Sequence, residues 1–129
     1  MQPPAVLLID GDPDSLTIYS ILLEHHGYRV LCASNGNDGL RQAEEEQPQL
    51  VVLEPFTPCR CEGGILEAFQ ANPATASIPL IVLTAIPGFL ISGYAGIPAD
   101  RLFMKPMQPR RLLSVVERIL DQQMPAIPA

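Results

Sequence analysis

Four short apolar runs of this chain each end at a single polar residue. The runs, each with the residue that ends it, are 6–9 with Asp10, 50–53 with Glu54, 80–83 with Thr84, and 102–104 with Lys105. Continuous apolar runs of this length are typical of parallel strands that are buried on both faces. Because parallel strands bring their carboxyl ends to one edge, where open α/β sheets place their sites, we expect the four polar side chains to converge there.

Helix-like segments alternate with these runs, and the alternation predicts a single doubly wound α/β domain on a five-stranded parallel sheet. The expected strands are residues 5–9, 28–33, 50–53, 80–83 and 102–104, and the expected helices are 13–26, about 40–46, 65–71 and 112–120. Asp12 suits the N-cap of the first helix, and Gly27 suits its end. We expect the domain to cover residues 1–123 and residues 124–129 to be a Pro-rich tail or the start of a linker.

The fourth crossover, after Thr84, is the least regular part of the chain. Its helix-breaking residues are Pro87, Gly88, Gly93, Gly96 and Pro98. This pattern predicts a fourth helix that is short or distorted, which makes about five helices in all.

Composition and charge exclude two classes of function. The 129 residues carry a formal charge of -6, whereas a surface that binds nucleic acid needs clustered Lys and Arg. Apolar runs stay far below the roughly 18 to 20 residues that cross a bilayer, and a signal segment is not evident at residue 1. We therefore expect a cytoplasmic protein with neither nucleic-acid nor membrane partners.

The cysteines and histidines do not form a recognisable metal or disulfide framework. Cys32, Cys59 and Cys61 are an odd set without a second paired motif, so we expect three reduced thiols. His25 and His26 lack ligand spacing to these cysteines. We interpret His26 as a packing residue and His25 as a surface residue.

Two carboxylates, a hydroxyl and an ammonium at one sheet edge are the groups that phosphoryl chemistry uses. Their order and spacing resemble the receiver domain of bacterial response regulators over most of the chain. The segments that carry the resemblance are VLLIDGDPDS, LVVLEPFTP, PLIVLTA and FMKP. The resemblance implies a flavodoxin-like sheet of order 2-1-3-4-5 and a role in two-component phosphorelay signalling, with a histidine kinase or an output protein as partner.

The resemblance also implies a role for single residues. Asp10 matches the first acid of the family, Thr84 the switch hydroxyl, and Lys105 the charge-balancing lysine. Pro106 and Pro58 match two family prolines, and the Lys105–Pro106 bond would then be cis, which X-Pro bonds permit.

Three positions depart from the family pattern: Glu54 stands where the family has its acceptor aspartate, Gly11 at the second acid, and Leu102 at a position that is commonly aromatic. Glu54 moves its carboxylate outward by about 1.5 Å, and a misplacement near 1 Å can cost about a hundredfold in rate. Magnesium needs near-octahedral oxygen ligands, and Gly11 supplies none from its side chain. The sequence therefore predicts that ordinary magnesium-dependent phosphorylation is altered or lost.

We accordingly expect an atypical receiver, or pseudo-receiver, that is a phosphorylation-independent interaction module, is not an enzyme and requires no cofactor. The alternative is a receiver that still accepts a phosphoryl group or binds magnesium weakly, through Asp10, Glu54 and Phe56. Asp12 either replaces part of the missing acid or simply caps its helix.

Two interpretations of Glu54 remain open at this point. Its carboxylate is either partly buried and satisfied by Lys105, or its longer side chain reaches toward Thr84 and Lys105 and imitates an acyl phosphate.

Two further alternatives come from other parts of the pattern. The segment LLIDGD also looks like the opening of haloacid dehalogenase-type phosphatases, with Asp10 as nucleophile and Asp12 as general acid. A homodimer would use the face from Ile86 to Ile97 together with the helix from Arg110 to Leu120.

Overall fold

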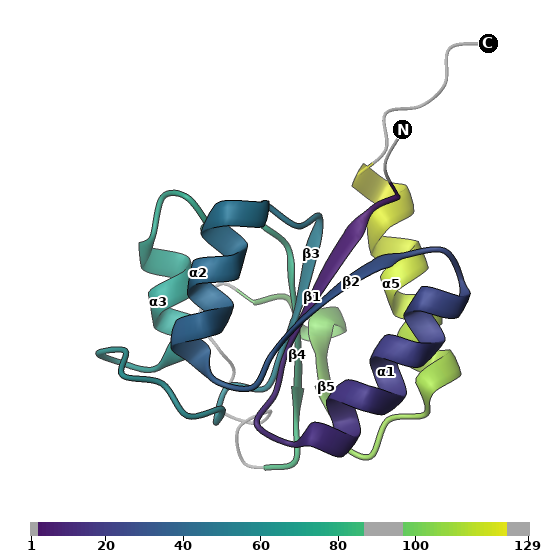
Figure 1. Ribbon diagram of the computed structural model, residues 1–129, viewed down its shortest axis with the longest axis horizontal. Coiled ribbons are helices and arrows are strands. Elements are labelled where there is room, and N and C mark those ends of the chain that lie inside the picture. The colour runs from purple at the N-terminus through teal and green to yellow at the C-terminus, as the bar shows by residue number, and fades with distance from the viewer. Residues whose placement is uncertain (1–2, 87–96, 124–129) are drawn as a thin grey trace, which may run out of the picture.

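Five strands form one parallel sheet in the order β2-β1-β3-β4-β5, as predicted. They are β1 (Ala5–Ile9), β2 (Arg29–Ala33), β3 (Leu50–Leu53), β4 (Leu80–Thr84) and β5 (Leu102–Met104). The structure is a computed structural model, and it describes residues 3–86 and 97–123. In Figure 1 the strands run through the middle of the molecule between two layers of helices.

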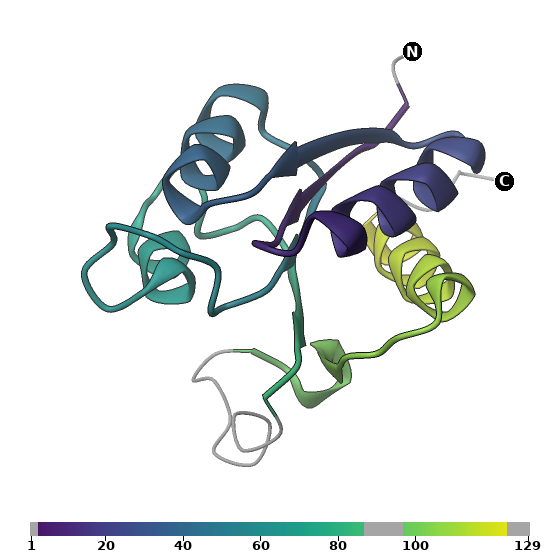
Figure 2. The same cartoon turned by 60° about the horizontal axis from the view of Figure 1, so that its bottom comes forward.

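Helices cover both faces of the sheet. They are α1 (Pro13–His25), α2 (Gly36–Glu46), α3 (Ile65–Ala71) and α5 (Pro109–Gln123), with a short 3-10 helix η1 (Ala99–Arg101) before β5. Figures 1 and 2 show α1 and α5 on one face and α2 and α3 on the other. The fold is therefore the predicted flavodoxin-like one. Within residues 3–86 and 97–123, no helix is long and apolar enough to cross a membrane.

Two expected features fall outside the described residues. The predicted short or distorted fourth helix lies mostly in residues 87–96, and the predicted tail is residues 124–129.

The two central strands explain why their sequences are continuously apolar. Each residue of β1 and of β3 is buried. Val6 and Leu8 belong to the core layer under α1 and α5, whereas Leu7 and Ile9 belong to the layer under α2 and α3. Because successive side chains point to opposite faces, both faces of these strands must be apolar.

The first helix begins where the sequence predicts and ends one residue earlier, at His25. The Asp12 side chain caps it by accepting the Asp14 N–H, and Pro13 takes the first position. Gly27 follows the helix with a φ of 91°, which a glycine adopts at little cost. The prediction that His26 packs is wrong: His26 is the exposed C-cap, and one of its ring nitrogens contacts the Leu22 carbonyl.

Helix α2 lies unusually close to β1, and Gly39 permits this approach. A Cβ atom added at Gly39 would lie 2.5 Å from Cδ1 and 2.9 Å from Cγ1 of Ile9. Ile9 is 1% exposed and β-branched, so it has little freedom to move aside. The glycine therefore sets the spacing between α2 and the strand that leads into Asp10.

We expect Gly39→Ala to lower the free energy of unfolding by about 1–2 kcal/mol, because overpacking outweighs the better helix propensity of alanine. In the Ile9→Val background, which lacks Cδ1, the same substitution should cost clearly less. Urea unfolding of the four proteins measures both effects. Equal costs in the two backgrounds would contradict this account of the close approach.

Candidate functional site

The parallel register brings three of the four predicted polar residues together at the carboxyl edge of the sheet. Ile9 of β1 pairs with Leu53 of β3, so Asp10 and Glu54 are the next residues along neighbouring strands. Lys105 follows β5, and its N–H donates to the carbonyl of Thr84 at 2.8 Å. Residues that are 95 positions apart in the sequence, Asp10 and Lys105, thereby come into contact.

The Lys105 ammonium lies between the two carboxylates. Its Nζ is 2.5 Å from Oδ2 of Asp10 and 3.7 Å from Oε2 of Glu54. The three side chains are 17%, 12% and 11% exposed for Lys105, Asp10 and Glu54 respectively. Water screens charges weakly at such burial. Each charged group is therefore stabilised mainly by the opposite charge beside it.

The remaining oxygen of each carboxylate binds a backbone N–H of its own loop. Oδ1 of Asp10 accepts from the N–H of Asp12 at 2.9 Å. Oε1 of Glu54 accepts from the N–H of Phe56 at 3.1 Å. All four carboxylate oxygens therefore have a donor within the protein or lie near the ammonium.

Thr84 reaches the same edge but takes part in a separate contact. It is the last residue of β4 and is fully buried, at 0% exposure. Its Oγ1 accepts from the N–H of Ile86 at 3.2 Å. Across the described part of the chain, no hydrogen bond joins Glu54 to Thr84.

Asp12 lies beside the charge cluster but belongs to α1. Its carboxylate accepts from the Asp14 N–H and the Ser15 hydroxyl, each at 3.0 Å. The hydrogen bond from Ser15, followed by that from Asp14, holds the pKa of Asp12 below its usual value. The Asp12 carboxylate therefore stays ionised down to a lower pH than usual, and it continues to cap the helix there. These contacts favour the capping interpretation.

The residues of the edge do not fit a magnesium ion. The cation position between Asp10 and Glu54 holds the Lys105 ammonium, and Gly11 offers no carboxylate. A Cβ atom at residue 11 would lie 3.3 Å from Cδ of Pro58, so a second acid here would need the proline to shift by a few tenths of an ångström. In the ranges 3–86 and 97–123, no group of three or more His, Cys, Asp or Glu residues is placed to hold a metal.

The segment around Lys105 is held by contacts that the sequence did not reveal. The Lys105–Pro106 bond is cis, as the family resemblance implied. The Tyr19 hydroxyl on α1 donates to the carbonyl of Met107 at 2.9 Å, and burial raises the pKa of Tyr19. The signal in the sequence that could have indicated this contact was the polar end of Tyr19 on an otherwise apolar helix stripe.

Leu102, the third departure from the family pattern, is half-buried at the start of β5. The next residue, Phe103, packs on the opposite face of the sheet, and the Arg111 guanidinium lies over its ring at 5.5 Å from the centroid.

The expectation of three reduced thiols is wrong. Cys59 and Cys61 form a disulfide in the loop between β3 and α3, and Cys32 is a free, exposed thiol. The Cα atoms of the bridge are 5.2 Å apart, which lies within the usual range for disulfides. A framework that joins distant segments leaves paired cysteine motifs in the sequence, whereas this bridge closes within three consecutive residues.

Comparison with known proteins points to one class. No protein-family profile matches the chain. Over 131 residues it is 31% identical to the alkaline phosphatase synthesis transcriptional regulatory protein PhoP of Bacillus subtilis, covering 96% of this chain and 51% of that protein. Over 85 residues it is 33% identical to Protein PilH of Pseudomonas aeruginosa, covering 61% of this chain and 65% of that protein. The chain thus spans about half the length of PhoP.

Solved structures of response regulators are also similar to this chain. The chemotaxis response regulator CheY4 of Vibrio cholerae has a TM-score of 0.76 at 22% identity, covering 91% of this chain and 98% of that one, which shows a shared CheY-like fold. The CheY-like response regulator receiver domain protein of Methanospirillum hungatei has a TM-score of 0.77 at 27% identity, covering 94% of this chain and 96% of that one. Within this fold, the chain belongs to the receiver domains of response regulators.

Replacing Lys105 by methionine tests the charge cluster, because it removes the ammonium and keeps a long unbranched side chain. We expect Lys105→Met to lower the free energy of unfolding by about 3–5 kcal/mol, since two mostly buried carboxylates lose their countercharge. Adding Asp10→Asn should recover part of this loss. Urea unfolding at neutral pH measures both. Full stability in Lys105→Met, or simple additivity of the two substitutions, would contradict the coupling.

Proposed function

We propose that this receiver domain is an atypical module of two-component signalling that binds its partner without magnesium-dependent phosphorylation at residue 54. The proposal places Glu54 at the acceptor position of the family and rests on one observation. The Lys105 ammonium lies 2.5 Å from Asp10 and 3.7 Å from Glu54, so both carboxylates already face a cation within the chain.

The state of Glu54 argues against phosphoryl transfer to it. A nucleophilic carboxylate needs an oxygen that can approach phosphorus in line, and small misplacements are costly. One Glu54 oxygen is bound by the Phe56 N–H, and the other faces Lys105. The added methylene also displaces the carboxylate relative to an aspartate.

The lack of fit for magnesium supports the same conclusion. Phosphoryl transfer to a carboxylate develops negative charge on the transferred group, which a divalent cation normally offsets. Here Lys105 takes the space between the acids, and Pro58 packs against Gly11. We therefore propose a module that is not an enzyme and needs no metal.

Of the two interpretations of Glu54, the contacts favour a carboxylate satisfied by Lys105. Imitation of an acyl phosphate would also need a contact with the Thr84 hydroxyl, and no hydrogen bond joins Glu54 to Thr84 within residues 3–86 and 97–123. The domain is then held in one state by ordinary charge pairing. Such a state gives a partner a constant surface to recognise.

The phosphatase alternative has weaker support. It needs Asp10 as a free nucleophile, and both Asp10 oxygens are occupied, by Lys105 and by the Asp12 N–H. It also needs Asp12 as a general acid, and hydrogen bonds hold the pKa of Asp12 low, which keeps the proton off.

The proposed partners are signalling proteins, either a histidine kinase or an output protein. PhoP and PilH are longer than the matched segments, so a partner or output segment of this protein is also a matter of proposal.

Intact mass spectrometry after incubation with acetyl phosphate and magnesium tests the proposed loss of phosphorylation. We expect no added phosphoryl group on the parent protein. The double variant Glu54→Asp/Gly11→Asp, which restores both acids, should gain one. Glu45→Gln on the exposed face of α2 serves as the matched control and should behave as the parent.

A stoichiometric gain of one phosphoryl group on the parent that disappears in Glu54→Gln would contradict the proposal. It would instead support the alternative of a receiver that still accepts phosphate.

Self-association is a separate proposal. Ile86 and Met104 are exposed by 45% and 41% beside the edge strand β5. Ile97, at the other end of the predicted first segment, is half-buried and packs on the layer under α2 and α3, and residues 87–96 lie outside the described residues. The apolar residues of α5 fill the core, so the helix would contribute only its polar side. We expect sedimentation velocity to show concentration-dependent dimers that Met104→Gln weakens. A strict monomer at high concentration would contradict this.

A further inference from the structure

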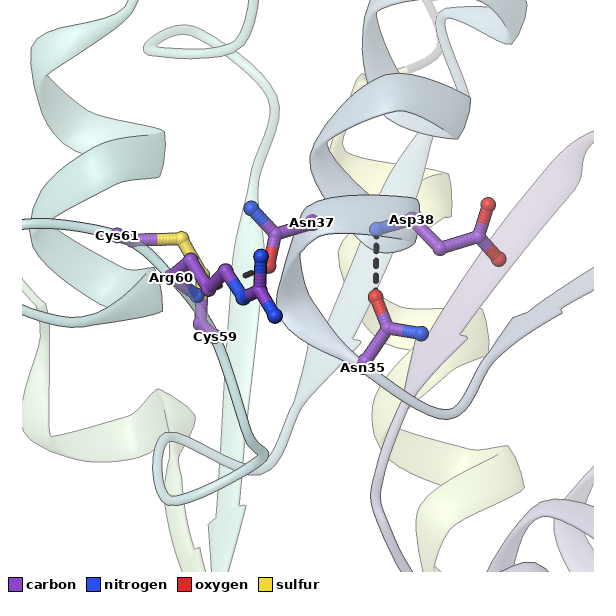
Figure 3. Close-up of a disulfide and its surroundings, with 6 residues drawn as sticks. All are labelled: Asn35, Asn37, Asp38, Cys59, Arg60 and Cys61. Atoms are coloured by element: carbon purple, nitrogen blue, oxygen red, sulfur yellow. Dashed lines mark hydrogen bonds between the residues drawn. A yellow bond between two sulfur atoms is a disulfide. The ribbon is translucent and has the colours of Figure 1, made fainter.

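The loop between β3 and α3 carries a second chemical group beside the charge cluster. Cys59 and Cys61 are joined by a disulfide on either side of Arg60, as Figure 3 shows. The same loop holds Glu54 through the Phe56 N–H. Neither the charge cluster nor the proposed signalling role uses the disulfide.

The disulfide is seated against the start of α2. A Cβ atom added at Gly36 would lie 2.6 Å from Cβ and 2.7 Å from Sγ of Cys59, so only a glycine leaves room for the bridge. The Gly36 N–H donates to the Pro58 carbonyl at 2.7 Å, and the Arg60 N–H donates to Oδ1 of Asn37 at 2.9 Å. The loop and the helix are thereby joined on both sides of Cys59.

One side of the bridge faces an open hollow, and the other side faces the core. Asn35, Asn37, Cys59 and Arg60 line the hollow together with Pro58. Both cysteines are half-buried and pack on the apolar layer under α2 and α3. A small molecule in the hollow can therefore reach Cys59 without unfolding the domain.

Arg60 gives this hollow a positive charge. Its side chain is exposed, and Figure 3 shows the side chain extending from the bridge toward the residues that begin α2. Thiolates, and not thiols, attack disulfides. A guanidinium beside the bridge attracts an anionic thiolate and favours the thiolate that leaves.

We propose that Cys59–Cys61 is a reversible thiol–disulfide site that exchanges with anionic low-molecular-weight thiols. A thiolate attacks Sγ of Cys59, forms a mixed disulfide and releases Cys61 as a thiolate, which takes up a proton. A second thiolate then attacks the mixed disulfide, and Cys59 leaves as the second thiolate and is protonated. The net change converts the protein disulfide and two small thiols into two protein thiols and one small disulfide.

Exchange at this site changes how the loop is held. The oxidised pair keeps Cys59 against Gly36, whereas two separate thiols are free to turn into the hollow. Since Phe56 and Cys59 lie on one loop, the redox state of the pair acts on the segment that positions Glu54. The site thus makes the loop beside the charge cluster sensitive to thiols.

Alkylation tests the site in the full chain carrying Cys32→Ser, which leaves only the pair to react. Under native conditions, N-ethylmaleimide should add to neither cysteine before treatment with reduced glutathione and to both cysteines after it. Intact mass counts the adducts, and oxidised glutathione should restore the unreactive form. Two adducts before reduction, or adducts only after unfolding in urea, would each overturn the proposal.

Arg60→Glu tests the charge of the hollow and provides a readout that a merely structural bridge would not show. We expect it to slow reduction by glutathione roughly twofold to fivefold, the size of a surface charge effect. Reduction by cysteamine, whose ammonium cancels the thiolate charge, should slow much less. Arg110→Glu on α5 is the matched control. Equal slowing by the two thiols would overturn the role given to Arg60.

Discussion

The burial of β1 and β3 between two helix layers is the constraint on which the rest of the structure depends. Every side chain of these strands is buried, so neither face can carry a polar group without a large cost. Polar chemistry is therefore confined to the strand ends. Asp10 and Glu54 stand at those ends on neighbouring strands, and two mostly buried carboxylates at such a place need a countercharge. Lys105 supplies it from the end of β5.

This countercharge connects stability with function. The partly buried site is stable only because the ammonium and both acids are present. If one of them is removed, the others stay buried without that partner, which lowers the free energy of unfolding. Gly11, at the position of the family's second acid, has no carboxylate, and Pro58 lies close to it. This arrangement of charges is the basis of the proposed function.

The loop after β3 joins the two chemical features of the domain. It supplies the N–H that binds Glu54, and further along it carries the disulfide that rests on Gly36. Amphipathic patterns predict helices but not the contacts of such a loop, because these contacts depend on close approaches and single hydrogen bonds. For this reason the sequence did not reveal the bridge between Cys59 and Cys61.

The sequence by itself determined the parallel sheet, its strand order, the capped first helix and the four residues at the strand ends. These follow from apolar periodicity, from local capping chemistry and from a family pattern that spans most of the chain. Only the tertiary structure decided which partner each group takes: Lys105 for Glu54, the Ile86 N–H for Thr84, and a helix cap for Asp12. Which polar groups pair depends on side-chain positions, to within about an ångström, at the ends of strands that are far apart in the sequence. Apolar periodicity carries no information at that scale.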